Sequence, residues 1–299
     1  MNAVRAQVPS AAVTESRCAR YDAALGRFER WLERHQEPDG LLQGENLSCN
    51  AYMPLPLYAH ATGRHDLAGR AWHMLEARYI RDGQLVQTEA RARMMPYTPA
   101  WLVMGAALEE NFRLRNSFSK LLLSFQDPRT GGFFGSVVAR DAGSGVIDFD
   151  STTQACAALC VAGHDTAAAK CGQFLRGLVQ AQPDPDRELF LQWDTSRGLI
   201  RDFDPKTISQ HVLAYAQPKQ HLYKIGLLAR AFALLHGVTG EPDYLELAEG
   251  HFKMAATRSP DIWTNTLAHK MAWAAWTLFG VGGPNLGIAQ AAVRLLQGH

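Results

Sequence analysis

The sequence predicts an all-α protein, an (α/α)5-6 toroid of helical hairpins with long loops over one end. Three observations support this class: a glycine–aspartate turn that recurs between helices, a second aspartate–glycine turn at the opposite helix ends, and apolar positions with helical spacing. Alternation typical of a strand is expected only in a short loop piece near residues 135–138.

The first of these turns occurs three times, at residues 61–66, 161–165 and 238–243. In each copy a glycine follows an apolar stretch, and an aspartate comes soon after it. Glycine is favoured at the left-handed position that ends a helix, and an aspartate stabilises the N-terminus of the next one. The three copies therefore predict tight helix–turn–helix hairpins.

The connections at the other end of the hairpins are longer. Helices over residues 28–35, 71–80, 118–126 and 168–182 are expected to lead into aspartate–glycine turns, short apolar pieces and then long polar loops. Ten or eleven helices in all would make five or six hairpins. Such hairpins can stack as an open solenoid or close as a ring. Apolar helices on both sides of each turn favour a closed ring around a pocket.

Composition limits the class of partner. The 299 residues are taken as one toroid domain, residues 18–299, after a loose tail, residues 1–17. The formal net charge of +1, from 30 basic and 29 acidic side chains, gives no basic field for nucleic acid. The most apolar late run, residues 271–283, is shorter than the ~20 residues that span a bilayer. Five cysteines, an odd number, favour a reducing cytoplasm over a disulfide framework.

We therefore expect a small-molecule substrate, no nucleic-acid partner and no cofactor, with a homodimer left as an open alternative.

One resemblance is to terpenoid cyclases. Residues 124–136, SFQDPRTGGFFGS, resemble the Q-x-x-D-G-G-F-G repeat of terpenoid cyclases and prenyltransferase β-subunits. Residues 148–155, DFDSTTQA, are similar to the D-x-D-D-T-A segment of class II terpenoid cyclases, with Ser151 in place of the third aspartate. This resemblance implies that Asp150 is the acid that protonates a substrate.

A second resemblance is to carbohydrate-acting (α/α)6 proteins, the acylglucosamine-epimerase-like and six-hairpin glycosidase-like enzymes. Residues 226–235, GLLARAFALL, and residues 239–245, TGEPDYL, are similar to their inner helix and the turn after it. This resemblance implies a toroid and a sugar substrate. The paired catalytic histidine helices of the epimerases are not found in the sequence.

The candidate site residues are polar or aromatic side chains in the long loops or near the starts of the helices that follow them. The candidate catalytic residues are Asp150, Asp148, His221 and Glu89. The candidate substrate-binding residues are Arg91, Arg93, Tyr97, Tyr52, Trp193, Tyr215, Lys219, Tyr223, Lys224 and Lys270. No metal site is expected. Cys156, Cys160 and His164 are four apart on one helix face, but their alanine and leucine neighbours favour buried structural cysteines.

Each chemical role has a structural alternative. Asp148 and Asp150 precede an apolar helix, so either could cap it, whereas in an apolar pocket one could be a general acid with a raised pKa. Glu89 could serve as acid or base, with an arginine beside it holding an anionic group, or the segment could be a solvated loop. His221 could shuttle protons or lie in a polar surface loop. The aromatic side chains could line a cavity or pack in the core.

Three functions remain open. The first is acid–base catalysed cyclisation or isomerisation of a small terpenoid-like or polyketide-like substrate in the toroid pocket, with Asp150 as the acid. The second is a carbohydrate isomerase, lyase or hydrolase of the (α/α)6 type. The third is a non-catalytic helical-repeat binding module. A polar cavity would favour the carbohydrate enzyme, and an apolar aromatic cavity would favour the cyclase or isomerase. The lack of a buried titratable group at the loop end would favour the binding module.

Overall fold

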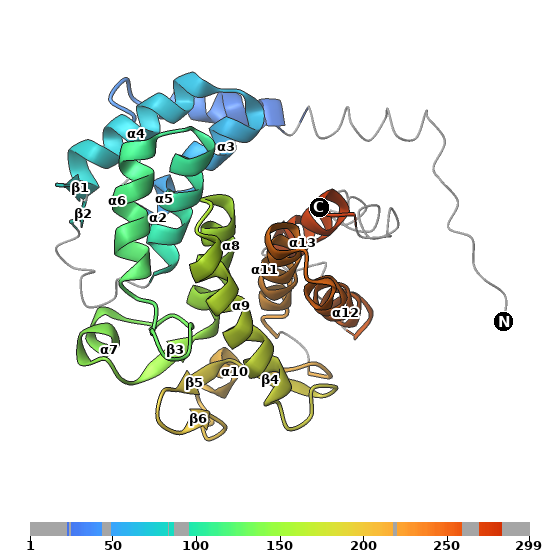
Figure 1. Cartoon of the computed structure of the whole chain (residues 1–299). Coiled ribbons are helices and arrows are strands. Elements are labelled where there is room, and N and C mark those ends of the chain that lie inside the picture. Colours follow the sequence, from blue (N-terminus) through green and yellow to red (C-terminus); the bar gives the residue numbers. More distant parts are fainter. Residues whose placement is uncertain are drawn as a thin grey trace, which may run out of the picture.

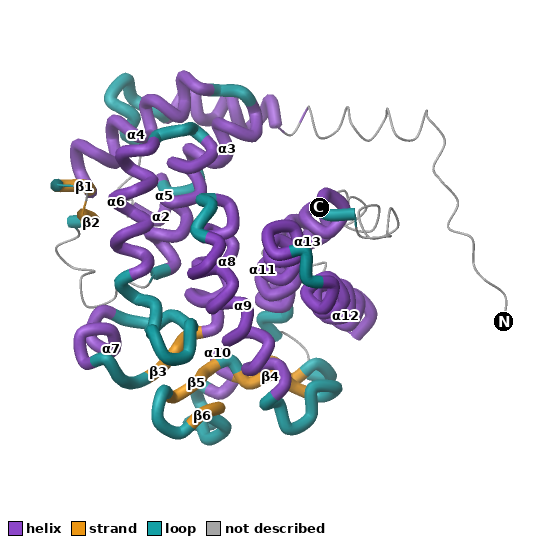
Figure 2. The backbone as a smooth tube through the Cα atoms, in the orientation of Figure 1, coloured by secondary structure: helices purple, strands orange, loops and turns teal. Residues whose placement is uncertain are grey.

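The computed structural model describes residues 23, 25–43, 49–82, 84–86, 96–217, 220–258 and 269–282 (Figure 1). These residues are mostly helical, and turns or loops send the chain back and forth between neighbouring helices (Figure 2). The predicted N-terminal tail, residues 1–17, lies outside the described residues. Within the described ranges, no helix is both long and apolar enough to cross a membrane.

Five helices in the described ranges form the inside of the fold. They are α3 (Leu55–Thr62), α5 (Tyr97–Leu108), α8 (Phe149–Val161), α11 (Tyr223–Thr239) and α13 (His269–Gly280), and the short α2 (Cys49–Tyr52) precedes them. Each of the five contacts the next in that order. Residues 99–106 and 151–160 are buried without interruption, as expected of helices enclosed on all sides.

A second set of helices covers the first from outside. It consists of the helical residues 25–35, α4 (His65–Tyr79), α6 (Phe112–Leu123), α9 (Asp165–Gln180) and α12 (Pro242–Arg258). These helices are amphipathic: α9, for example, buries Ala168, Cys171, Leu175 and Leu178, which are spaced by three or four residues. The pairs α3–α4, α5–α6, α8–α9 and α11–α12 pack as hairpins, which is the predicted toroid architecture.

The predicted short turns are confirmed. Gly63, Gly163 and Gly240 follow α3, α8 and α11 with φ of 69°, 73° and 72°, the left-handed conformation that glycine adopts most easily. The aspartates that come next, Asp66, Asp165 and Asp243, lie in the first turns of α4, α9 and α12.

The opposite end carries the longer connections (Figure 1). They contain two short helices, α7 (Val137–Ala142) and α10 (Ile208–His211). The strands are β1 (Ile80–Arg81), β2 (Gln84–Leu85), β3 (Val146–Asp148), β4 (Glu188–Phe190), β5 (Gln192–Asp194), β6 (Gly198–Leu199) and β7 (Val212–Ala214). All pairings are antiparallel: β1 with β2, β3 with β5, β5 with β6, and β4 with β7.

The prediction of a strand-like piece near residues 135–138 is wrong. The chain there enters helix α7, because the Ser136 side chain caps it by accepting a hydrogen bond from the Ala139 backbone N–H at 3.1 Å. The strand of this region is instead β3, which ends at Asp148 and leads directly into α8.

Two glycines let inner helices approach closely. A Cβ atom on Gly226 of α11 would lie 2.8 Å from the backbone oxygen of Lys270 at the start of α13. A Cβ atom on Gly105 of α5 would lie 3.0 Å from the Cβ of Pro56 in α3. The first contact holds the N-terminal turns of α11 and α13 together, and those turns carry three of the predicted site residues, Tyr223, Lys224 and Lys270.

Candidate active site

Four inner helices, α5, α8, α11 and α13, begin at the end with the long connections, and their first turns bring five predicted residues together. We call Tyr97, Asp150, Tyr223, Lys224 and Lys270 the loop-end cluster. The Lys224 Nζ lies 2.8 Å from the Asp150 Oδ2. The Lys270 Nζ lies 4.5 Å from the centre of the Tyr223 ring and 5.7 Å from that of Tyr97. Residues far apart in the sequence thus form one charged and aromatic site.

Asp150 keeps hydrogen-bonding capacity after its ion pair is formed. Its side chain is 28% exposed, and its second oxygen, Oδ1, has no hydrogen-bond partner among the described residues. Lys224 is more deeply buried and also donates to the backbone oxygen of Gln210 at 3.4 Å. The ammonium group therefore fixes one edge of the carboxylate, and the oxygen at the other edge is buried and unpaired among the described residues.

The environment shifts the pKa values of Lys270, Tyr223 and Tyr97. Burial, together with the nearby Lys224 charge, lowers the pKa of Lys270, although Asp150 opposes this shift. Burial and the negative charge of Asp150 raise the pKa of Tyr223 to about 12. The same causes raise the pKa of Tyr97, so both phenols are protonated near neutral pH.

Asp148 has the structural role that the sequence left open. It is the N-cap of α8, where its Oδ2 accepts a hydrogen bond from the Ser151 backbone N–H at 2.8 Å. Burial and the neighbouring Asp150 raise its pKa. Asp150, two residues later, lies in the first helical turn and is the aspartate that meets Lys224.

A cavity of about 380 Å³, which we call the inner-helix cavity, lies between four of the inner helices, and its lining includes the largely exposed Trp276. It is lined by residues of α3 and by Trp101, Arg230, Trp273 and Trp276 from α5, α11 and α13. The Trp101 ring is 6.3 Å from that of Tyr97 and 5.2 Å from that of Trp273. This chain of aromatic contacts connects the cavity with the loop-end cluster.

Three predicted cavity residues lie elsewhere. Tyr52 is fully buried, and its hydroxyl accepts a hydrogen bond from the Leu42 backbone N–H at 3.1 Å. Trp193, on β5, packs against Phe174 of α9 at 5.9 Å between ring centres. Tyr215 follows β7 and has the Arg258 guanidinium 5.9 Å from its ring centre. Each is held by packing outside the loop-end cluster, which corrects the expectation that they shape the pocket.

Of the remaining candidates, the structure describes His221 but not the other four. The His221 ring lies 5.5 Å from the ring of Tyr223 and so borders the cluster. Glu89, Arg91, Arg93 and Lys219 lie outside the described residues.

The sequence did not single out Arg230 or Trp101 as candidates, and for Trp273 core packing was the structural alternative. Arg230 was detectable in principle, because it is the one charged side chain in the apolar stretch of residues 225–235. Trp101 had no such signal, since a tryptophan in an apolar helix is indistinguishable from core packing.

The described cysteines behave as buried core residues. Cys49, Cys156, Cys160 and Cys171 are free and buried. Across the described ranges, no group of histidine, cysteine and carboxylate side chains is arranged to hold a metal ion.

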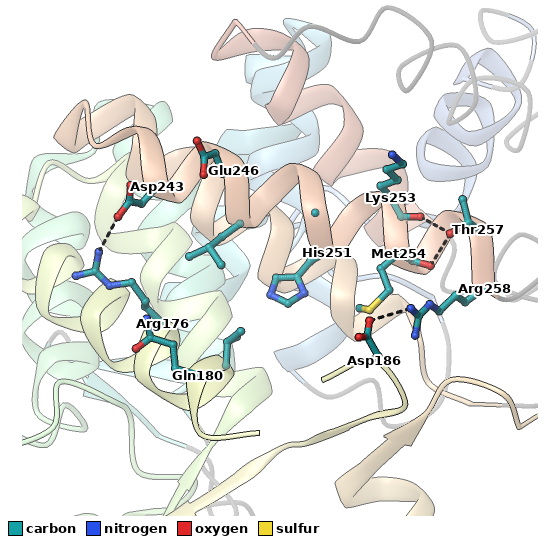
Figure 3. A pocket seen from close by; sticks show the side chains of 13 residues that line it. Arg176, Gln180, Asp186, Asp243, Glu246, His251, Lys253, Met254, Thr257 and Arg258 are labelled. Carbon is teal, nitrogen blue, oxygen red and sulfur yellow. Dashed lines mark hydrogen bonds and ion pairs between the residues drawn. The ribbon is translucent and has the colours of Figure 1, made fainter. Parts of the chain in front are cut away.

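A larger groove, of about 620 Å³, lies on the outside of the fold between α9 and α12 (Figure 3). His251 points into it, while Arg176 pairs with Asp243 at 3.8 Å and Arg258 with Asp186 at 2.9 Å along its walls. Burial lowers the pKa of His251 to about 4, so this side chain is neutral near neutral pH. The arginine and aspartate side chains along this groove form ion pairs with one another, so we take the loop-end cluster as the candidate active site.

No protein-family model and no curated protein matches the sequence. Solved structures do match the fold. A D-mannose isomerase superposes with a TM-score of 0.66 at 12% identity, covering 97% of this chain and 87% of the isomerase. The α-1,6-mannanase GH76A of Salegentibacter sp. HEL1_6 gives 0.62 at 14% identity, over 90% of this chain and 83% of the mannanase. The chain has the (α/α)6 toroid fold.

A third similar structure is the unsaturated glucuronyl hydrolase of Bacillus sp. GL1, with a TM-score of 0.56 at 12% identity over 88% of this chain and 75% of that one. All three neighbours are carbohydrate enzymes, in agreement with the second resemblance found in the sequence. The first resemblance, to terpenoid cyclases, is not supported by these structures.

Proposed function

We propose that the protein is a carbohydrate isomerase or lyase that moves a proton next to a sugar carbonyl at the loop-end cluster. The observation that carries this proposal is the Asp150–Lys224 ion pair of 2.8 Å, with Lys270 beside it, inside the ring and under the long connections. The carbohydrate isomerase and hydrolases of the same fold support a sugar substrate.

The cluster contains the groups that such a reaction needs. A carboxylate can take the proton from the carbon next to a carbonyl, and the buried Oδ1 of Asp150 has no hydrogen-bond partner among the described residues that would compete for that proton. The electron pair of the broken C–H bond then moves toward the carbonyl oxygen, which gains negative charge. The ammonium groups of Lys224 and Lys270 stabilise that charge. Isomerisation returns the proton to the former carbonyl carbon, while the hydroxyl proton on the deprotonated carbon passes to the former carbonyl oxygen. Elimination instead expels a leaving group from the next carbon, and the carbonyl forms again.

The lining of the inner-helix cavity is mostly apolar and aromatic, which by itself matches the cyclase hypothesis, but such a lining can also hold a sugar. Trp101 and Trp273 present aromatic rings within it, and the apolar face of a pyranose can pack on such a ring while its hydroxyls bond to polar groups. A cavity of about 380 Å³ lies in the size range of small-molecule sites.

Hydrolysis has less support from the described residues. Glycosidases commonly place two carboxyl groups on either side of the scissile bond. At the cluster the described carboxylates are Asp148 and Asp150, and Asp148 is engaged in capping α8. A single available carboxylate between two lysines matches proton transfer better.

The other two hypotheses are also less well supported. A cyclase acid must carry a proton that it gives to the substrate, whereas Asp150 is ion-paired with an ammonium group. A binding module would not need titratable groups enclosed at the loop end, yet Lys224 is buried there and Lys270 is only partly exposed.

The proposal is tested by incubating the protein with a panel of neutral and acidic monosaccharides in D2O and following them by NMR. We expect deuterium to enter a carbon next to the carbonyl of at least one sugar, with loss of this exchange in Asp150→Asn. Asp186→Asn, at a carboxylate that is 83% exposed, is the matched control and should exchange like the wild type. The absence of exchange in all sugars, or unaltered exchange in Asp150→Asn, would contradict the proposal.

A further inference from the structure

Arg230 is a charged residue in the middle of an otherwise apolar inner helix. Its neighbours Leu228, Ala229 and Ala231 are fully buried, and Arg230 itself is partly buried and lines the inner-helix cavity. An arginine at such a position loses much of its hydration, so it is expected to have a specific electrostatic partner.

The contacts of Arg230 do not include a carboxylate within the described residues. Its guanidinium carbon lies 5.3 Å from the centre of the Trp273 ring, and Nη2 approaches the Met104 sulfur at 3.5 Å. The Nη1 atom is buried and has no hydrogen-bond partner among the described residues. Burial lowers the pKa of Arg230 to about 10, which leaves it charged near neutral pH. This cation is therefore not neutralised by the described protein.

The charged side chains in this region also leave an excess of positive charge. The cationic side chains here are Lys224, Lys270 and Arg230, and the nearby described carboxylates are Asp148 and Asp150. Asp150 is paired with Lys224, and Asp148 is engaged with the backbone of α8. Lys270 contacts two tyrosine rings, and its pKa is lowered chiefly by burial and also by the nearby Lys224 charge.

We propose that the inner-helix cavity binds an anionic monosaccharide, one that carries a carboxylate or a phosphate, with its acidic group on Arg230 and its ring against Trp101 and Trp273. A guanidinium binds carboxylate and phosphate oxygens through two parallel hydrogen bonds, which a neutral sugar cannot match. With the acidic group in the cavity, the other end of the sugar faces the loop-end cluster. This inference rests on the proposed function and names its substrate class.

Binding measurements test it without requiring turnover. Isothermal titration is performed with glucose, galactose and mannose, with the uronate and 6-phosphate of each, and with inorganic phosphate. We expect at least one acidic sugar to bind about tenfold or more tightly than its neutral parent, the gain of charge-assisted hydrogen bonds. Uronates and 6-phosphates distinguish the two acidic groups. Equal affinity for every acidic sugar and its parent, or binding of inorganic phosphate alone, would overturn the inference.

Variants assign the effect to Arg230. Arg230→Met keeps the length of the side chain without its charge and should remove the preference for the acidic sugar. Arg176→Met, in an arginine that pairs with Glu241 and Asp243 on the outside, should retain it. Retention of the preference in Arg230→Met would mean that the arginine has a structural role only. If that variant fails to fold, Arg230→Lys replaces it. This variant should bind acidic sugars more weakly and neutral sugars as the wild type does. An equal loss of affinity for both kinds of sugar would overturn the inference.

Failure of this inference is separable from failure of the proposed function. Asp150-dependent deuterium exchange on neutral sugars, unaffected by Arg230→Met, would overturn the anionic substrate class and leave the isomerase or lyase proposal in place. Acidic sugars that bind through Arg230 but never exchange would contradict the proposed function and support the binding site.

Discussion

The carboxylate of Asp150 and the ammonium group of Lys224 form a 2.8 Å ion pair between the first turns of α8 and α11, with side chains 28% and 11% exposed. The pair connects two adjacent inner helices where their N-termini meet. Its low exposure distinguishes it from the surface ion pairs of the protein, and this difference can be measured.

A double-mutant cycle with Asp150→Asn and Lys224→Met should give a coupling free energy of about 1–3 kcal/mol, because each single change leaves a partly buried charge without its partner. Urea unfolding of the four proteins measures it. The Asp186–Arg258 pair has nearly the same separation, 2.9 Å, but is 83% and 39% exposed. Its coupling should stay below about 1 kcal/mol. Equal coupling in the two cycles would show that the inner pair gains nothing from burial.

Gly226→Ala should destabilise the protein by about 1–3 kcal/mol, since the added methyl group meets the Lys270 backbone at 2.8 Å and forces α11 away from α13. Gly250→Ala, in α12 with no atom within 4 Å of the new methyl group, should instead stabilise by about 0.5–1 kcal/mol. Thermal unfolding with parallel sugar-binding measurements checks both. A Gly226→Ala variant with the same stability as the wild type would contradict the close approach of the two helices.

Asp148 can be tested as a cap rather than a catalyst. Asparagine caps a helix as well as aspartate does, so Asp148→Asn should retain both stability and activity. Asp148→Ala should lose about 1 kcal/mol of stability. Loss of activity in Asp148→Asn, with the fold intact by circular dichroism, would instead place Asp148 in the reaction.

The helical architecture was predictable because its determinants are local. Gly63, Gly163 and Gly240 end helices by a backbone conformation that glycine adopts readily, whatever the rest of the chain does. The strands were not predictable, because β3 is only three residues long and forms through pairing with β5, 46 residues further on. The sequence shows no alternation over such short pieces.

The site was predictable in part for the same reason. Asp150, Lys224 and Lys270 lie in first helical turns after long connections, a position that sequence alone identifies. Their convergence depends on how the helices pack, which the sequence does not specify locally. Tyr215 illustrates the opposite case: its polar neighbours suggested a site, but its ring is buried near Arg258.

Stability should depend on pH through His251. Its pKa is about 4 in the folded protein and near the ordinary 6.5 when unfolded, so between these values the unfolded chain binds a proton that the folded protein does not. The free energy of unfolding should therefore fall as the pH falls from about 6.5 toward 4, by no more than about 3 kcal/mol from this group. Urea unfolding across this range measures the loss.

His251→Leu isolates that contribution, because His164 and His211, whose pKa values are also lowered, remain in both proteins. The variant should gain stability relative to the wild type as the pH falls through this window. A constant difference between the two proteins at all pH values would show that His251 takes up no proton on unfolding.

The central claim, that the protein transforms a sugar at the loop-end cluster, is tested most directly by kcat/KM of Asp150→Asn on the sugar identified by deuterium exchange. The account predicts a fall of about a hundredfold or more relative to wild type, as for loss of a general base, with Asp186→Asn unchanged. An Asp150→Asn enzyme with wild-type kcat/KM would contradict it.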